Sequence, residues 1–156
     1  MDETGLPFVD EHAVTVGAPA AAVWAELVET LDRSFSGPAT GWYVRAVGGH
    51  DRTASGPRPL TTGSTFPGFH VVTAVPGREL ALEGRHRFST YALTFRLDPA
   101  GPDRTRLRAE SCATFPGVLG GTYRALVLGT RGHVVLMRRM LGSIRDRAEG
   151  RGRAAA

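Results

Sequence analysis

The sequence has little of the chemistry that cross-links small domains or anchors proteins in membranes. Its single cysteine, Cys112, cannot form an intramolecular disulfide, and no Cys/His spacing predicts a closed zinc site. No apolar run approaches the roughly 18 residues that span a bilayer. The first residues, MDETGLPFVDEH, also lack the basic flank and apolar centre of a secretion signal. We therefore expect a reducing, cytoplasmic location, no membrane span and no metal.

Lysine, asparagine and glutamine are absent, so all 19 basic residues are arginine. This usage is typical of a compositional bias and says little about partners. The positive charge is concentrated at one end, because residues 104–156 carry eleven arginines and three acidic residues. Four arginines recur every seven residues and form one stripe on a helix: Arg124, Arg131, Arg138 and Arg145. A phosphate or anionic membrane surface would fit this stripe. We favour a solvated helix flank and no nucleic-acid partner, because no aromatic residues interleave with it.

The length of 156 residues, with 42% hydrophobic and 22% charged residues, predicts one domain with its own core. Hydrophobic periodicity predicts a helix at Ala20–Leu31 and a closing helix at about Val118–Arg147. We assign residues 1–149 to the domain and 150–156 to a flexible tail. Period-two alternation and turn signals predict the strands, which are Phe8–Val16, Trp42–Val47, Phe69–Val75, Glu79–Arg87, Ser89–Leu97 and Arg104–Phe115.

The closing helix has two features that a straight rod does not explain. Gly129 and Gly132 each destabilise a helix interior by about 1 kcal/mol relative to alanine, which allows a kink there in the one long helix that we predict. Leu128 and Val135 lie opposite the core face, and either a homodimer contact or a bent helix is needed to hide them. Of the two tryptophans, we expect Trp42, like Trp24, to be a core aromatic.

Three stretches resemble the START-like SRPBCC superfamily, which includes polyketide cyclases, aromatases and lipid-transfer domains. They are VTVGAPAAAVWAELVE, the strand pair GRHRFSTYALTFRL and TRLRAESCATFPG, and the helix GGTYRALVLGTRGHVVLMRRML. The resemblance implies an α+β helix-grip fold, in which a curved antiparallel sheet wraps around a long C-terminal helix, with short N-terminal helices. It also implies a small hydrophobic ligand, such as a polyketide, lipid or isoprenoid-like molecule, and no cofactor.

A curved sheet that holds a helix over its concave side leaves a cavity where the inward side chains are small. Small inward positions on the last strand are Ala109, Ser111 and Ala113. The helix opposite offers the candidate ligand-binding residues Tyr123, Thr130, His133 and Met137. Strand alternation adds His86 and Tyr91 to the inward face.

His133 and His86 are the candidate catalytic residues. A histidine and a tyrosine such as Tyr91 could polarise a carbonyl and move a proton, as an aldol-type cyclisation or dehydration requires. Simple packing of these side chains in the core is the alternative for each. We therefore leave three functions open: a non-catalytic ligand binder, a cofactor-independent cyclase or dehydratase, and a protein-binding adaptor.

Overall fold

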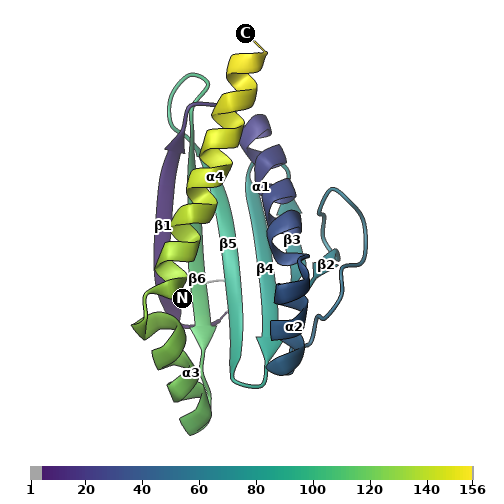
Figure 1. The fold of residues 1–156 in the computed structure, drawn as a ribbon. Helices are drawn as coiled ribbons and strands as arrows, with labels where there is room; N and C mark the ends of the chain where they lie inside the picture. Colours follow the sequence, from purple (N-terminus) through teal and green to yellow (C-terminus); the bar gives the residue numbers. More distant parts are fainter. Residues whose placement is uncertain (1–4, 156) are drawn as a thin grey trace.

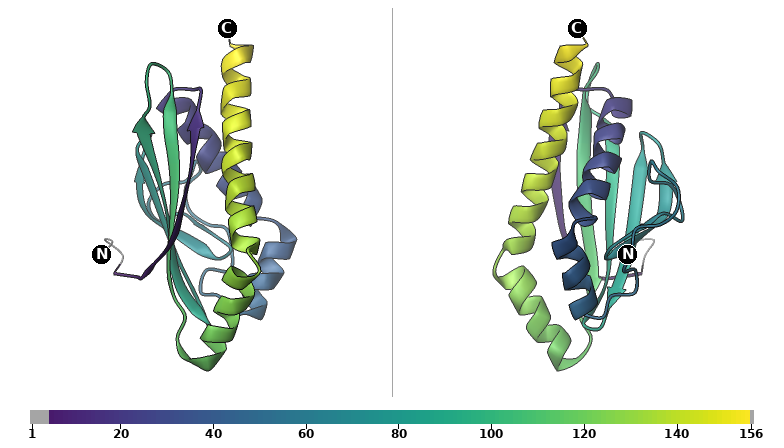
Figure 2. Two further views of the ribbon diagram at one scale, coloured as in Figure 1. Left: turned by 90° about the vertical axis from the view of Figure 1, so that its left-hand side faces the viewer. Right: turned by 45° about the vertical axis from the view of Figure 1, so that its right-hand side comes forward.

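The computed structural model describes residues 5–155 and contains one antiparallel sheet covered on one face by helices (Figures 1 and 2). The sheet has six strands in the order β1-β6-β5-β4-β3-β2. This α+β arrangement confirms the fold class. The strands are β1 (Phe8–Val16), β2 (Thr65–Phe66), β3 (Phe69–Val75), β4 (Glu79–His86), β5 (Ser89–Pro99) and β6 (Thr105–Thr114).

Four helices lie on the same side of the sheet (Figure 2). They are α1 (Ala20–Phe35), α2 (Pro38–Ala46), α3 (Gly117–Gly129) and α4 (Gly132–Ala154). The apolar face of α1 packs against α4 and the sheet through Val23, Leu27 and Leu31, which are all fully buried. This burial removes the apolar stripe of an amphipathic helix from water and closes the upper part of the core.

The segment Trp42–Val47 is helical, so its prediction as a strand is wrong. Gly37 ends the preceding turn and Pro38 occupies the first turn of α2, where its missing N–H has no helical partner to lose. Only Val44 on this short helix is buried. Trp42 is 74% exposed and is not a core residue. The aromatic and β-branched residues had suggested a strand, but the helix start signal prevails.

The prediction of one continuous helix over Val118–Arg147 is wrong. The segment forms two helices, α3 and α4, with a break between them. Arg131 connects them in the left-handed region with φ of 57°, between Gly129 and Gly132. Leu128, at the end of α3, lines the cavity next to this bend, and the bend accounts for its partial burial. Val135 remains 52% exposed.

The end of α4 is fastened to the rest of the chain. It continues to Ala154, into the segment assigned to a tail. Glu149 accepts a hydrogen bond from the Gly17 backbone N–H at 2.9 Å. Arg151 contacts Glu26 and Glu29 on α1, with Nε 2.5 Å from Glu26 Oε1. The division into a domain of residues 1–149 and a tail stays a prediction.

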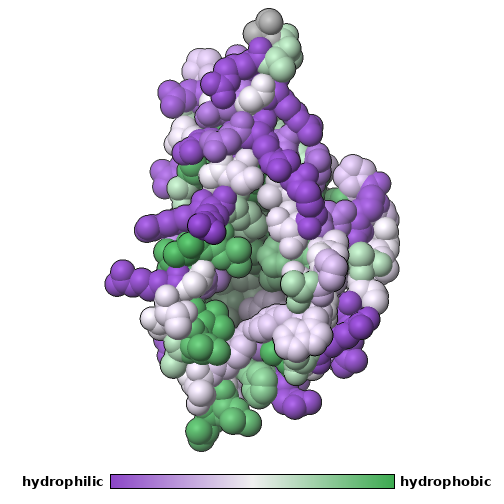
Figure 3. All heavy atoms as spheres, in the orientation of Figure 1, coloured by the Kyte–Doolittle hydropathy of each residue, from purple (hydrophilic) through white to green (hydrophobic). Residues whose placement is uncertain are grey.

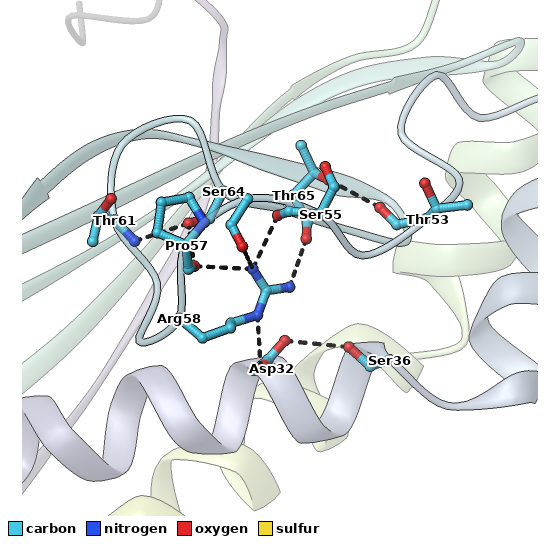
Figure 4. A network of polar contacts seen from close by, with 10 residues as sticks. Asp32, Ser36, Thr53, Ser55, Pro57, Arg58, Thr61, Ser64 and Thr65 are labelled. Atoms are coloured by element: carbon cyan, nitrogen blue, oxygen red, sulfur yellow. Dashed lines mark hydrogen bonds and ion pairs between the residues drawn. The ribbon is translucent and has the colours of Figure 1, made fainter.

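The loop between α2 and β2 is held by Arg58 (Figure 4). Its guanidinium donates to Asp32 on α1 at 3.0 Å and to the carbonyl oxygen of Thr65 at 2.8 Å. Further along, the Gly68 N–H donates to the carbonyl oxygen of Asp51 at 2.8 Å. These bonds fix the β2–β3 turn, which contributes a backbone carbonyl to the site described next.

Candidate functional site

A cavity of about 150 Å³ lies between the sheet and the α3–α4 bend. A hollow is visible in the space-filling view at the place where α2 and α3 face each other (Figure 3). Most of the wall is apolar or aromatic, with a few polar groups. The lining residues are Val9, Phe69, His86, Ser89, Tyr91, Ala92, Leu93, Ser111, Cys112, Ala113, Phe115, Tyr123, Val127, Leu128 and His133.

Of the residues predicted from the sequence, the structure brings five to this cavity: His86, Tyr91, Ser111, Tyr123 and His133.

Two predicted residues lie elsewhere. Thr130 is exposed and bonds back to the Leu126 carbonyl at 2.6 Å, because α3 ends there. Met137 is 2% exposed and belongs to the core between α4 and the sheet. The helix break rotates both of them away from the cavity relative to a straight helix, so we do not retain them as ligand-binding candidates.

His86 is placed at the end of β4 by strand alternation and is buried. Its Nδ1 accepts a hydrogen bond from the Phe88 backbone N–H at 3.1 Å. The neutral ring therefore carries its hydrogen on Nε2. Burial lowers the pKa of His86. At neutral pH this side chain is consequently a hydrogen-bond donor rather than a base. Of the two predicted actions, it can polarise a carbonyl but is not suited to remove a proton.

Tyr91 lies on β5 opposite Gly84 of β4. Its hydroxyl donates to the Gly68 carbonyl at 2.6 Å. Burial raises the pKa of Tyr91, and the nearby Tyr43 and Asp51 raise it further. The phenol stays protonated over the physiological range, so it can accept a hydrogen bond from a ligand but cannot act as a phenolate base.

Tyr123 of α3 meets Tyr43 of α2 at the mouth of the cavity, hydroxyl to hydroxyl. Its ring also packs edge-on against His86, with centroids 4.8 Å apart, and stacks on Phe88. Burial, followed by the bond to Tyr43, raises the pKa of Tyr123. The sequence analysis did not identify Tyr43, because it placed this residue in a strand.

His133 begins the second polar group of the site, at the start of α4. Its Nε2 lies 3.1 Å from Ser111 Oγ and 3.3 Å from Asp10 Oδ1. The other carboxylate oxygen of Asp10 lies 3.1 Å from His12 Nε2. Sequence reasoning missed Asp10 and His12. The signal that could have found them is their alternation with Val14 and Val16 on β1, which puts both on the inward face.

This group does not have the geometry of a serine hydrolase triad. In such a triad the serine and the carboxylate bond to different nitrogens of the histidine. Here Ser111 and Asp10 approach the same nitrogen of His133. With an ionised Asp10 accepting the Nε2 hydrogen, the ring has its lone pair on Nδ1, which forms no hydrogen bond within residues 5–155. The arrangement can hold a base at Nδ1 but does not activate Ser111.

The described residues lack two further features. They contain no group of three or more His, Cys, Asp or Glu side chains placed to hold a metal ion. No helix among them is both long and apolar enough to cross a bilayer.

No family model and no curated protein matches the chain. Solved structures do match. The Zhui aromatase/cyclase from Streptomyces sp. R1128 has a TM-score of 0.62 at 18% identity, with 97% of this chain and 98% of that chain covered.

Two other structures extend the comparison. Norcoclaurine synthase from Thalictrum flavum has a TM-score of 0.58 at 11% identity, with 94% of this chain and 99% of that chain covered. The di-domain ARO/CYC StfQ of the steffimycin biosynthetic pathway has a TM-score of 0.57 at 13% identity, with 92% of this chain and 51% of that chain covered. With the sheet order and the closing helices, these similarities show that the chain has the helix-grip fold that the sequence resemblance implied.

Proposed function

We propose that this protein binds a small, largely apolar molecule carrying an aromatic ring, in the cavity between the sheet and α3. The observation that carries the proposal is the cavity itself, with apolar walls and a few polar groups. A volume of about 150 Å³ is the size that accommodates a single aromatic ring. A larger ligand would extend towards Tyr43 and Tyr123, and the contact between their hydroxyls would have to open to admit it. Solved neighbours that are aromatase/cyclases support this ligand class.

The polar groups would orient the ligand rather than supply most of the affinity. His86 would donate from Nε2 to a carbonyl or hydroxyl oxygen, while Leu93, Phe115 and Val127 would bury the ring. Ring burial contributes roughly 25 cal/mol for each Å² removed from water, whereas one neutral hydrogen bond contributes about 1 kcal/mol net. Affinity should therefore follow the apolar area of the ligand.

A calorimetric titration with 2-naphthol tests this proposal. Wild-type protein should bind it at one site. Ala113→Trp would place an indole in the cavity and should abolish binding, with folding checked by circular dichroism. Ala13→Trp is the matched control, because Ala13 is exposed on β1. Equal binding by both variants, or no binding by the wild type, would refute the proposed site.

A second candidate function, proton transfer in a cyclase or dehydratase, is supported by the pairing of His133 with Asp10. Nδ1 of His133 would remove a hydrogen next to a ligand carbonyl, and Nε2–H of His86 would donate to the resulting enolate oxygen. In a cyclisation or an exchange reaction, the proton taken up by His133 would then return to carbon. In a dehydration it would protonate the leaving hydroxyl group, which departs as water.

Deuterium exchange at the α-carbon of 2-tetralone, followed by NMR, is the test of catalysis. The wild type should accelerate exchange over buffer, and His133→Gln should remove the acceleration. His70→Gln serves as the control, because His70 pairs with Asp51 outside the cavity. Exchange no faster than in buffer would leave ligand binding as the function.

A cytoplasmic location and a homodimer stay predictions.

A further inference from the structure

We propose that α2, α3 and the first turns of α4 form a docking face for an anionic phospholipid bilayer, beside the mouth of the cavity. This inference goes beyond ligand binding and rests on side chains that the cavity does not use. The docking face consists of six exposed apolar residues: Trp42, Val118, Leu119, Leu126, Val135 and Leu136.

The exposure of these side chains is unusual for a folded domain. Val118 is 87% exposed, Trp42 74% and Leu119 68%. α3 starts at one end of the molecule (Figure 1), and Val118 and Leu119 lie in its first turn. In the same orientation, hydrophobic atoms border the hollow along α3, while the other end of this face is mostly hydrophilic (Figure 3). Several exposed apolar side chains gathered around one hollow mark a candidate interaction site.

The charge around the docking face has one sign. Residues 33–50 and 111–145 contain no aspartate or glutamate, and the second of these stretches contains five arginines. Arg124, Arg131 and Arg138 are all exposed. Exposed arginine, leucine and valine side chains on the same helices are a combination that binds the interface of an anionic membrane. The sequence alone favours a solvated flank for the arginine stripe, and the exposed apolar side chains beside it are the new observation.

Charge also argues against a second copy of the chain as the occupant. A two-fold dimer places the same surface patch on both sides of its interface. Arg131 and Arg138 of one copy would then approach those of the other without acidic residues on α3 or the first half of α4 to compensate. A bilayer containing anionic lipid supplies the missing negative charge.

Part of the docking face lies on the two helices that meet at the edge of the cavity. Tyr43 and Tyr123 meet at the mouth, and Trp42 and Leu119 lie on the same two helices as this pair. A bilayer held against α2 and α3 would therefore lie beside the cavity. An apolar ligand could then move between lipid and cavity with little exposure to water.

Co-sedimentation with vesicles tests the docking face. The wild type should bind vesicles that contain phosphatidylglycerol and should bind pure phosphatidylcholine vesicles much more weakly. Replacing Leu119 and Leu126 by serine should weaken binding at least tenfold, because two apolar side chains no longer enter the lipid. Arg131→Gln should weaken it about fivefold. The controls Val75→Ser and Arg78→Gln alter exposed residues at the β3–β4 turn and should have no effect.

Three results would overturn the inference. One is no binding to anionic vesicles. Another is binding that the serine substitutions leave unchanged while the protein binds polyglutamate resin equally well, which would indicate charge attraction to any acidic polymer. The third is a concentration-dependent dimer in sedimentation velocity that Leu119→Ser dissociates. Because 2-naphthol titration is measured without lipid, failure of membrane docking is distinguishable from failure of the proposed cavity.

Discussion

Gly84 lies under the ring of Tyr91 across the β4–β5 ladder. A Cβ atom at Gly84 would lie 2.6 Å from Cζ of that ring and would also meet the Gly68 carbonyl to which Tyr91 donates. The absence of a side chain at Gly84 thus allows Tyr91 to lie flat at the floor of the cavity and to keep its hydroxyl bond.

Gly84→Ala should therefore displace Tyr91. We expect a loss of about 1–3 kcal/mol in the free energy of unfolding, since the neighbours are backbone and a ring. Affinity for 2-naphthol should fall in parallel. Gly142→Ala on α4 is the matched control, because a Cβ there meets nothing within 4 Å. That change should stabilise the protein by about 1 kcal/mol. Unchanged stability and binding in Gly84→Ala would contradict the packing described.

Acidification should destabilise the protein partly through His86. Its folded pKa is lowered by burial, whereas the unfolded side chain titrates near 6.5. As the pH falls below 6.5, the unfolded chain takes up a proton that the folded chain does not, so stability decreases until the folded pKa is reached. The free energy of unfolding should therefore fall less steeply with decreasing pH in His86→Gln than in the wild type.

Chemical denaturation at about pH 7.5 and about pH 5.5 measures this difference. His50→Gln provides the comparison, because His50 is exposed. A His86→Gln variant with the same pH dependence as the wild type would show that His86 does not resist protonation.

The contact between Glu26 and Arg151 should stabilise the end of α4. Glu26 is fully buried, and neither of its carboxylate oxygens accepts a well-directed hydrogen bond within residues 5–155. The 2.5 Å approach of Arg151 Nε is thus a charge contact of poor direction. Arg151→Ala should cost roughly 2 kcal/mol, less than for a fully buried pair because Arg151 is 61% exposed.

Adding Glu26→Leu to Arg151→Ala should recover most of that loss, since no buried charge then remains. Thermal denaturation of the two single variants and the double variant measures the coupling. Arg153→Ala, two residues further along the same helix, should be neutral. Additive effects of Glu26→Leu and Arg151→Ala would mean that the two side chains do not interact.

Asp10 should determine which nitrogen of His133 carries hydrogen. In the wild type the ring should be protonated on Nε2, with Nδ1 open, because Asp10 accepts from Nε2. Asp10→Asn removes the negative charge and should increase the share of the other tautomer, as seen in the ¹⁵N shifts of the ring. Asp51→Asn should change His70 and leave His133 unaffected. Identical His133 shifts in wild type and Asp10→Asn would rule out this positioning role.

The sequence predicted the fold where local patterns were strong. Alternation in β4, β5 and β6 located His86, Tyr91 and Ser111 on the inward face, and all three line the cavity. The prediction failed at Trp42–Val47, where β-favouring residues follow a helix start. It also failed at Thr130 and Met137, because the helix break that redirects them depends on the backbone conformation of one residue, Arg131.

Contacts between distant segments could not be predicted from the sequence. The pairing of Asp10 with His133 joins β1 to α4, and that of Tyr43 with Tyr123 joins α2 to α3. No local period encodes either pairing, because each depends on how helices settle over the sheet. The arginine stripe was visible in the sequence, but the apolar side chains exposed beside it were not.

Native mass spectrometry with added 2-naphthol tests the central claim, a cavity that accepts a ligand, most directly. The account predicts a one-to-one adduct for the wild type and for Ala13→Trp, and the bare chain for Ala113→Trp. A bare wild-type mass with excess 2-naphthol present would contradict the account, as would an adduct that persists when the indole occupies the cavity.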